Sequence, residues 1–204
     1  HVGDCEGPCR LVCPAGMDIP QMLRFIQSEN WFSAIQVIKE RIPLPATLGR
    51  VCPAPCEKVC RLGKIAEPVS ICEMKRVVAD RDLESSEPYI PPIAPATGKS
   101  VSIIGAGPCG LSAAYYLRIK GHSVHIYDKK AMAGGLLRID DLSQMLPSVI
   151  LDQEIGILKQ MGVDFNFENF IDKELFTQLE SFHDVILIAT GMMALHGVSD
   201  IPVP

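Results

Sequence analysis

The sequence lacks any cluster of basic residues and any uninterrupted apolar segment long enough to span a membrane. Its 204 residues include 19 Lys and Arg against 24 Asp and Glu, and the basic residues are scattered. A net charge of −5 provides no basic face for a nucleic-acid backbone. The longest uncharged run, residues 100–117, contains GAGPCG, which would interrupt a spanning helix. We therefore expect neither a nucleic-acid partner nor a membrane span.

No secretion signal is visible within these 204 residues, which begin without an initiator methionine. The chain begins at His1, with no basic segment followed by an apolar one. Eight cysteines could form a disulfide framework, but seven of them lie in the first 72 residues, and the rest of the chain has the pattern of a nucleotide-binding enzyme. This distribution favours thiolate ligands in a reducing compartment, so we expect a cytoplasmic protein.

Six of the cysteines form two runs with the same CxxxCxxxC spacing. They are Cys5, Cys9 and Cys13 in the first run and Cys52, Cys56 and Cys60 in the second. Structural zinc more often uses CxxC knuckles, whereas iron–sulfur clusters take about four thiolates each, at times with a histidine in place of one. Seven cysteines and one other ligand would serve two 4Fe–4S clusters. Two clusters are the favoured prediction, and zinc or unligated thiols are the alternatives.

Residues 1–84 are expected to form a helical domain, because no alternating strand pattern interrupts the apolar periodicity after residue 17. The expected helices cover residues 18–30, 31–41 and 70–83. The stretch SSEPYIPPIAPATGK, residues 85–99, is rich in Pro and Ser and predicts a linker.

Residues 100–204 follow the order strand, helix, strand that is typical of a parallel α/β sheet. The first strand and helix cover residues 101–104 and 111–121, and the second strand covers 122–128. Later segments predict helices over 149–162 and 173–182, a strand over 163–167, and a buried parallel strand over 183–191. The pattern predicts a doubly wound α/β domain.

The segment GAGPCG places Gly105, Gly107 and Gly110 in GxGxxG spacing between a strand and a helix. The first glycine permits the tight turn, the second lets a pyrophosphate approach the backbone, and the third lets the helix pack closely on the strand. Asp128 ends the next strand, 18 residues past Gly110, where an acid can hydrogen-bond a ribose hydroxyl. Dinucleotide binding is the prediction, and a purely structural turn is the alternative.

Three further motifs resemble the FAD domain of the two-dinucleotide-binding flavoproteins. They are Pro108 within GAGPCG, MAGGLLR at residues 132–138, and ATG at residues 189–191. The resemblance implies FAD at this turn, the MAGGLLR loop near the flavin or its ribityl chain, Lys129 beside the adenosine, and ATG beside the pyrophosphate. The expected cofactor-binding residues are Gly105, Ala106, Gly107, Pro108, Gly110, Asp128, Lys129, Gly134, Gly135, Leu136, Ala189, Thr190 and Gly191.

Nearly the whole chain resembles the small (beta) subunit of NADPH-dependent glutamate synthase. The motifs that carry the resemblance are LPATLGRVCPAPCEKVC and PVSICEMKRVVAD before the linker, and VSIIGAGPCGLSAAYYL and MAGGLLR after it. The chain also looks like the N-terminal region of dihydropyrimidine dehydrogenase and the flavin subunits of electron-bifurcating complexes. This implies an α-helical ferredoxin-like domain with two 4Fe–4S clusters, an α/β doubly wound (Rossmann-like) FAD-binding domain, and other redox subunits as partners.

The resemblance also implies that the two cysteine runs interdigitate. One cluster would take Cys5, Cys9 and Cys60, and the other would take Cys13, Cys52 and Cys56. Each set is one ligand short. His1, four residues before Cys5, stands where the family has a further cysteine, and it is either that ligand or an ordinary terminal residue. For the second cluster, the family takes its fourth ligand from a Gln or Glu, and the matching position here is Lys75, a poor ligand while protonated. We expect Cys72 to replace it as the ligand. The alternative is that Cys72 is a buried thiol.

Two departures from the family limit the functional reading. The family inserts an NAD(P)H-binding domain after ATG, so NAD(P)H would act here only through a missing domain or a partner, and the chain is either a partial sequence or a natural half. Residues 139–147, IDDLSQMLP, replace an IPxFRLP-like pattern near the flavin.

We expect a subunit or fragment that relays electrons between FAD and two clusters. A docking and wiring module without turnover is the alternative, and a zinc-stabilised interaction domain is a third possibility.

No acid–base or nucleophilic constellation is evident. The histidines after the linker are dispersed along the chain, and we expect them at strand ends or on the surface; they are His122, His125, His183 and His196. Cys109, inside the glycine turn, is expected to be a small buried residue rather than a redox group.

Overall fold

The computed structural model describes residues 6–191, and its contacts divide them into two compact units. The first unit comprises residues 6–91 and 145–154, and the second comprises 92–144 and 155–191. Residues 85–91 of the expected linker therefore group with the first unit and 92–99 with the second. The return of residues 145–154 to the first unit was not predicted from the sequence.

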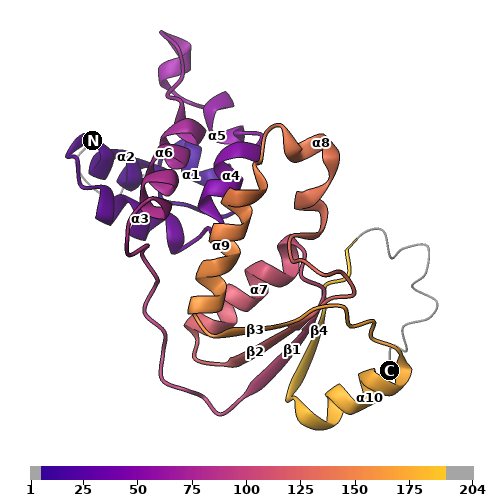
Figure 1. The fold of residues 1–204 in the computed structure, drawn as a ribbon. Coiled ribbons are helices and arrows are strands. Elements are labelled where there is room, and N and C mark those ends of the chain that lie inside the picture. The colour runs from indigo at the N-terminus through magenta and orange to yellow at the C-terminus, as the bar shows by residue number, and fades with distance from the viewer. Residues whose placement is uncertain (1–5, 192–204) are drawn as a thin grey trace. The chain divides into compact units, whose positions relative to one another are not determined.

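The first unit is helical (Figure 1). Its elements are α1 (Pro8–Leu11), α2 (Ile19–Gln27), α3 (Trp31–Lys39), α4 (Pro45–Val51), α5 (Pro55–Lys58), the 3-10 helix η1 (Leu62–Lys64) and α6 (Ile71–Leu83). The three expected helices are confirmed as α2, α3 and α6. Asp18 caps α2, as its position before the helix indicates, because its carboxylate accepts the Gln21 backbone N–H at 3.0 Å. The helices α1, α4 and α5 begin at prolines and are too short to have shown a clear apolar period.

The apolar core of the first unit joins α2, α3 and α6. Its most buried side chains include Met22, Ala34, Ile38, Ile71 and Ala79. Cys56 belongs to this core, and Cys9 and Cys13 pack against it. The thiols therefore lie at the boundary between a rigid apolar core and the protein surface.

Two buried charged residues hold distant parts of the first unit together. Lys39 is 2% exposed, and its ammonium donates to Asp82 Oδ2 at 2.6 Å and to the Tyr89 carbonyl at 2.5 Å. Glu154, also 2% exposed, accepts the backbone N–H groups of Ala46 and Thr47 at 2.7 and 2.8 Å. Both donors are in the first turn of α4, where N–H groups have no partner within the helix. Glu154 therefore satisfies the start of α4.

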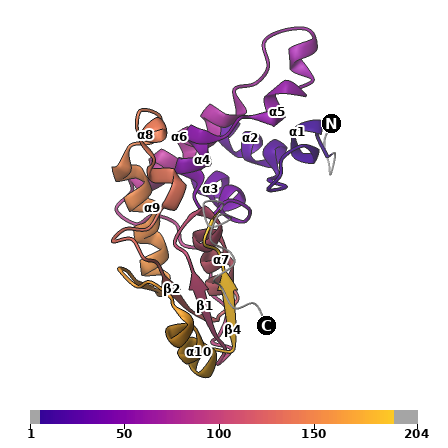
Figure 2. The same cartoon turned by 90° about the vertical axis from the view of Figure 1, so that its right-hand side faces the viewer.

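The second unit is a parallel sheet with strand order β3-β2-β1-β4. Its strands are β1 (Ser100–Ile104), β2 (Ser123–Tyr127), β3 (Val163–Asn166) and β4 (Val185–Ile188). Its helices are α7 (Pro108–Ile119), η2 (Gly135–Arg138), α8 (Asp140–Ser143), the later part of α9 (Ser148–Gln160) and α10 (Lys173–Phe182). Figures 1 and 2 both show α7 along the strands and α10 beside β4. The expected α/β order is confirmed.

The centre of the sheet is buried, but β4 is not. Ile103 on β1 and Ile126 on β2 are neighbours in the register and are fully buried. On β4, Val185 is 53% exposed and Ile188 is 42% exposed, so the expectation of a buried strand over 183–191 was wrong. The reason is topological: within residues 6–191 β4 pairs with β1 on one side and with no strand on the other.

None of the helices in the described part of the chain has the length and apolar character that a membrane crossing requires.

Candidate cofactor sites

Four cysteines of the first unit are linked by pairwise electrostatic interactions, Cys56 with Cys13 and Cys52, and Cys52 with Cys72, and we call them the Cys52 group. They are Cys13 after α1, Cys52 after α4, Cys56 in α5 and Cys72 in α6. Burial raises the pKa of Cys56 to about 11, and the charges of Glu57, Cys52 and Cys13 add to the rise. Burial also raises the pKa of Cys72, which shares a side-chain hydrogen bond with Cys52. The grouping matches the second expected ligand set.

Cys9 and Cys60 form a separate pair, the Cys60 group, although they come from different cysteine runs. Burial raises the pKa of Cys9, and the charge of Cys60 adds to this effect. The pKa of Cys60 is lowered, mainly because the backbone N–H of Val69 donates to its sulfur, with further N–H groups at Leu62 and Gly63. The first expected ligand set also contains Cys5 and His1, which lie outside the described residues.

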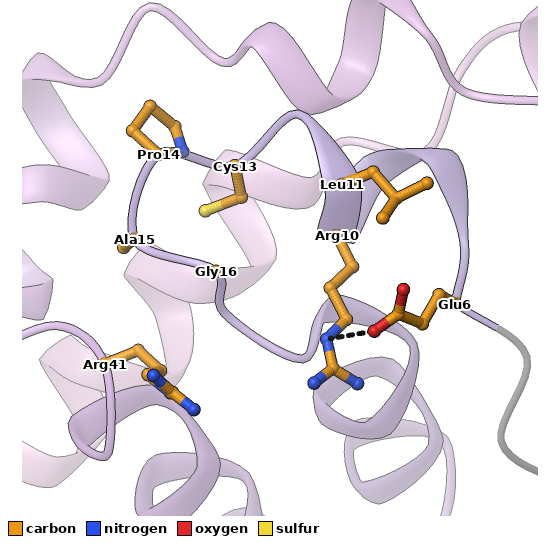
Figure 3. Close-up of a pocket in the computed structure, with 8 residues that line it drawn as sticks. All are labelled: Glu6, Arg10, Leu11, Cys13, Pro14, Ala15, Gly16 and Arg41. Atoms are coloured by element: carbon orange, nitrogen blue, oxygen red, sulfur yellow. Dashed lines mark ion pairs between the residues drawn. The ribbon is translucent and has the colours of Figure 1, made fainter.

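Each thiol group borders an open cavity. A cavity of about 390 Å³ lies beside Cys13, and Figure 3 shows Arg10 and Arg41 across it from the thiol. Arg10 lies 3.9 Å from Glu6 and 3.0 Å from Asp18, so its guanidinium is held at this rim. A second cavity, of about 300 Å³, borders Cys60 together with Lys58 and Lys64. Each cavity combines a thiol with two cationic side chains and one carboxylate, Glu6 in the first and Glu57 in the second.

Close contact between α4 and α6 brings Cys72 to the Cys52 group. The Cys72 thiol lies 3.5 Å from the Gly49 carbonyl oxygen and 3.8 Å from that of Leu48. A Cβ at Gly49 would lie 2.7 Å from Arg76 Cβ, so only glycine permits this approach. Two hydrogen bonds from Arg50 to Asp80, at 2.7 and 2.9 Å, join the same helices.

The donor set fits iron–sulfur chemistry. Among residues 6–191, no three His, Cys, Asp or Glu side chains are placed to hold one metal ion. A 4Fe–4S cluster makes a different demand, because its thiolates bind separate irons and do not converge on one atom. Soft thiolate ligands in a partly buried cage with N–H donors to sulfur meet that demand.

In the second unit, the three glycines of GAGPCG meet three different requirements. Gly105 has φ +112°, and a Cβ there would lie 2.3 Å from the Ala189 carbonyl oxygen. A Cβ at Gly110 would lie 1.9 Å from the Gly105 carbonyl oxygen. A Cβ at Gly107 would meet no atom within 4 Å. Gly105 and Gly110 are therefore needed for the turn itself, whereas Gly107 leaves open the side on which a pyrophosphate is expected.

The MAGGLLR loop packs directly on this turn. The Gly134 N–H donates to the Ala106 carbonyl at 2.8 Å. Gly135 has φ +54°, and a Cβ there would lie 2.8 Å from Gly107 Cα. The structure thus brings together two motifs that the sequence separates by more than 20 residues.

Asp128 and the start of α7 complete the expected dinucleotide site. Asp128 Oδ2 accepts the Ala106 N–H at 2.7 Å, and Oδ1 accepts the Lys130 N–H at 2.8 Å. Gly107 begins α7 without a side-chain cap, whereas Asp172 caps α10. The first N–H groups of α7 remain available to an anion. The other expected residues at this rim are exposed, namely Pro108, Lys129, Leu136, Thr190 and Gly191.

One expectation about side chains was wrong, and one contact was not predicted. Cys109 is exposed, not buried, because it lies in the uncapped first turn of α7. His122 and His183 lie just before β2 and β4, as expected. The rings of His125 and His183 lie 5.0 Å apart, and His125 Nδ1 is 3.1 Å from Asp164 Oδ2, which the sequence did not predict. Parallel pairing of β1 with β2 and β4 causes this proximity. His196 lies outside the described residues.

The burial of Lys75, which is 5% exposed, was not predicted from the sequence. The sequence does contain a signal for it, since Lys75 shares one face of α6 with the buried residues Ile71, Val78 and Ala79.

Comparison with known proteins identifies both regions. Residues 3–87 match the family model described as dihydropyrimidine dehydrogenase domain II, 4Fe–4S cluster. Residues 103–173 match the model described as NAD(P)-binding Rossmann-like domain. The chain therefore has an N-terminal 4Fe–4S domain followed by a Rossmann-like domain.

Named relatives match over nearly the whole chain. The NADP(+)-dependent formate dehydrogenase subunit beta of Moorella thermoacetica is 36% identical, over 92% of this chain and 30% of its own length. The NADH glutamate synthase of Saccharomyces cerevisiae is 34% identical, over 92% of this chain and 9% of its own. The NAD-dependent dihydropyrimidine dehydrogenase subunit PreT of Escherichia coli O157:H7 is 34% identical, over 95% of this chain and 47% of its own.

The chain is thus a homologue of NAD(P)-dependent oxidoreductases and their subunits, and the resemblance to glutamate synthase and dihydropyrimidine dehydrogenase is confirmed. It spans less than half the length of each of these three relatives.

Proposed function

We propose that the chain is the part of an NAD(P)H-linked oxidoreductase subunit that relays electrons between FAD and two 4Fe–4S clusters. When bound, FAD exchanges a hydride equivalent and each cluster exchanges one electron. The chain supplies the binding sites, the orientation of the cofactors and the charges around them. NAD(P)H and the final electron acceptor act through a further domain or a partner subunit, as the names of the relatives suggest.

The grouping of the thiols is the observation that carries the proposal. The Cys52 group supplies four thiolates to one cluster. The Cys60 group, with Cys5 and a fourth ligand such as His1, supplies the other. This separation into two groups crosses the order of the sequence, as the interdigitated family pattern requires.

FAD is the proposed dinucleotide because the MAGGLLR loop lies on the glycine turn. Because Gly135 lies against Gly107, the MAGGLLR loop lies beside the expected position of the pyrophosphate. In FAD, the flavin continues from the pyrophosphate and could lie along this loop. The match to an NAD(P)-binding model covers residues 103–173 and includes the glycine turn, which both dinucleotides use. NAD(P) is therefore the alternative ligand of the same turn.

The full-length protein, purified anaerobically, tests the proposal through its iron, sulfide and bound nucleotide. Two clusters predict about eight irons and eight sulfides per chain, and the nucleotide released by denaturation should be FAD at one per chain. Addition of NADPH or NADH should then bleach the flavin and cluster absorption. A colourless protein with zinc would overturn the proposal, and bound NAD(P) without flavin would reassign the turn.

The second candidate is a wiring module that connects redox partners without turnover of its own. A flavin bound at the open turn beside Gly107 would argue against this candidate. Full iron and sulfide with no flavin, and reduction by a partner subunit but not by NAD(P)H, would favour the wiring module.

A further inference from the structure

Lys75 is a buried cation without an acidic partner among the described residues. Its ammonium donates to the Leu48 carbonyl at 3.1 Å, and the side chain is 5% exposed. Lys39, the other buried lysine of the first unit, has the carboxylate of Asp82 at 2.6 Å. Glu57, an acid next to Cys72, accepts the Cys72 backbone N–H at 2.8 Å and makes no ion pair with Lys75. The charge of Lys75 is therefore not balanced by a described carboxylate.

The ammonium of Lys75 faces the Cys52 group. Its acceptor, the Leu48 carbonyl, also lies 3.8 Å from the Cys72 sulfur. The charge of Lys75 favours the thiolate of Cys72, which shows that the two groups interact. The Cys72 sulfur in turn shares a hydrogen bond with Cys52. Lys75 therefore lies beside the Cys72 thiol, and Cys72 connects it to the Cys52 thiol.

A buried ammonium is costly unless an anion or several dipoles compensate it. A cluster with four thiolate ligands has a net negative charge, because the thiolates carry more negative charge than the iron–sulfur core carries positive charge. One-electron reduction makes this net charge more negative. A fixed cation beside the cluster therefore stabilises the reduced form more than the oxidised form.

We propose that Lys75 is the counter-ion of the cluster held by the Cys52 group and raises its reduction potential. This inference rests on the proposed function, because it requires that the cluster is bound there. It assigns to Lys75 a positioned charge and not the role of a ligand. Cys72 supplies the thiolate, and Lys75 supplies the compensating charge from three residues further along α6.

Potentiometric titration of the full-length protein, followed by electron paramagnetic resonance, tests the inference. Dithionite supplies the single electron that each cluster takes up. Lys75→Met keeps the length of the side chain and removes its charge, whereas Lys75→Arg keeps the charge. Arg76→Gln removes a half-exposed charge from the same helix and is the matched control. Signals perturbed by Cys60→Ser identify the cluster of the Cys60 group.

In Lys75→Met, we expect the equilibrium constant for reduction of the Cys52-group cluster to fall at least tenfold. For a one-electron couple, this lowers the reduction potential by about 59 mV. The other cluster should keep its potential, and Lys75→Arg and Arg76→Gln should stay near the wild type. An unchanged potential in Lys75→Met, or an equal shift of both clusters, overturns the inference. Wild-type protein without clusters instead overturns the proposed function.

Iron analysis decides the case in which Lys75→Met fails to assemble this cluster. If Lys75→Met loses this cluster while Lys75→Arg assembles it with a normal potential, the positive charge is required. That result supports the role of Lys75 as a counter-ion. Loss in both variants assigns Lys75 a structural role only and overturns the inference.

Discussion

The two units build their candidate sites in opposite ways. In the first unit, the site consists of side chains: thiols at the edge of the core, with cations such as Arg41 and Lys75 around them. In the second unit, the site depends on missing side chains: Gly105 and Gly135 permit close backbone contacts, and Gly107 leaves open the side where a ligand is expected. A substitution at a thiol of the first unit would remove a proposed ligand, whereas a substitution at these glycines would add an obstacle.

The largest effect should come from an obstacle inside the glycine turn. Gly105→Ala places a Cβ 2.3 Å from the Ala189 carbonyl oxygen at φ +112°, and we expect the second unit to lose more than about 3 kcal/mol of unfolding free energy. Urea denaturation and the amount of bound nucleotide measure this, and nucleotide binding should be lost.

Gly107→Ala separates binding from folding, because its Cβ has free space and its φ of −80° is ordinary. It should cost about 1 kcal/mol or less and still abolish nucleotide binding. Wild-type nucleotide content in this variant would show that the pyrophosphate does not pass over Gly107.

Removal of a ligand in the first unit should have a more limited effect. Cys52→Ser should lower the iron content by about half, since one of two clusters is lost, and leave the nucleotide in place. Iron and sulfide assays with nucleotide quantification measure both. The exposed Cys109 offers a control: Cys109→Ser should keep all the iron, and a loss there would contradict the assignment of ligands.

Stability of the first unit should depend on pH through Glu154. Burial raises the pKa of Glu154 from 4.5 to about 7. The folded state therefore holds this proton more tightly than the unfolded state. The unfolding free energy should fall by about 3 kcal/mol as pH rises from 4.5 to 7. Glu154→Gln should remove that slope, and the difference between variant and wild type in urea denaturation at several pH values measures it. An equal slope in both proteins would contradict the prediction.

The smallest effect should come from the exposed ion pair of the second unit. Lys99 lies 2.7 Å from Asp184, and this contact raises the pKa of Lys99 and lowers that of Asp184. Solvent and salt screen such a pair. Lys99→Ala should shift the melting temperature little, and not at all in high salt, whereas Asp184→Ala should shift it more because Asp184 also accepts the Ser100 N–H.

Local patterns allowed much of the fold to be predicted. The apolar period over α6 and the order of β1, α7 and β2 depend on neighbours a few residues apart. The exposure of Val185 could not be predicted in that way, since it depends on which strands flank β4.

The same limit applies to the sites. Cysteine spacing led to the proposed ligands, which stay a prediction, and the face of α6 could have revealed the burial of Lys75. That Lys75 has no carboxylate partner among residues 6–191 depends on every element packed around it. The proximity of His125 and His183 likewise follows from pairing between segments distant in the sequence.

The bond between Glu154 and α4 has a consequence for the order in which the protein is made. The N–H groups of Ala46 and Thr47 leave the ribosome more than 100 residues before their acceptor. A nascent chain that ends at residue 91 contains every described thiol of both groups, yet the first turn of α4, the helix that leads into Cys52, lacks its carboxylate. The first unit thus reaches its final hydrogen bonding only after residues 92–144 of the Rossmann-like unit have been translated.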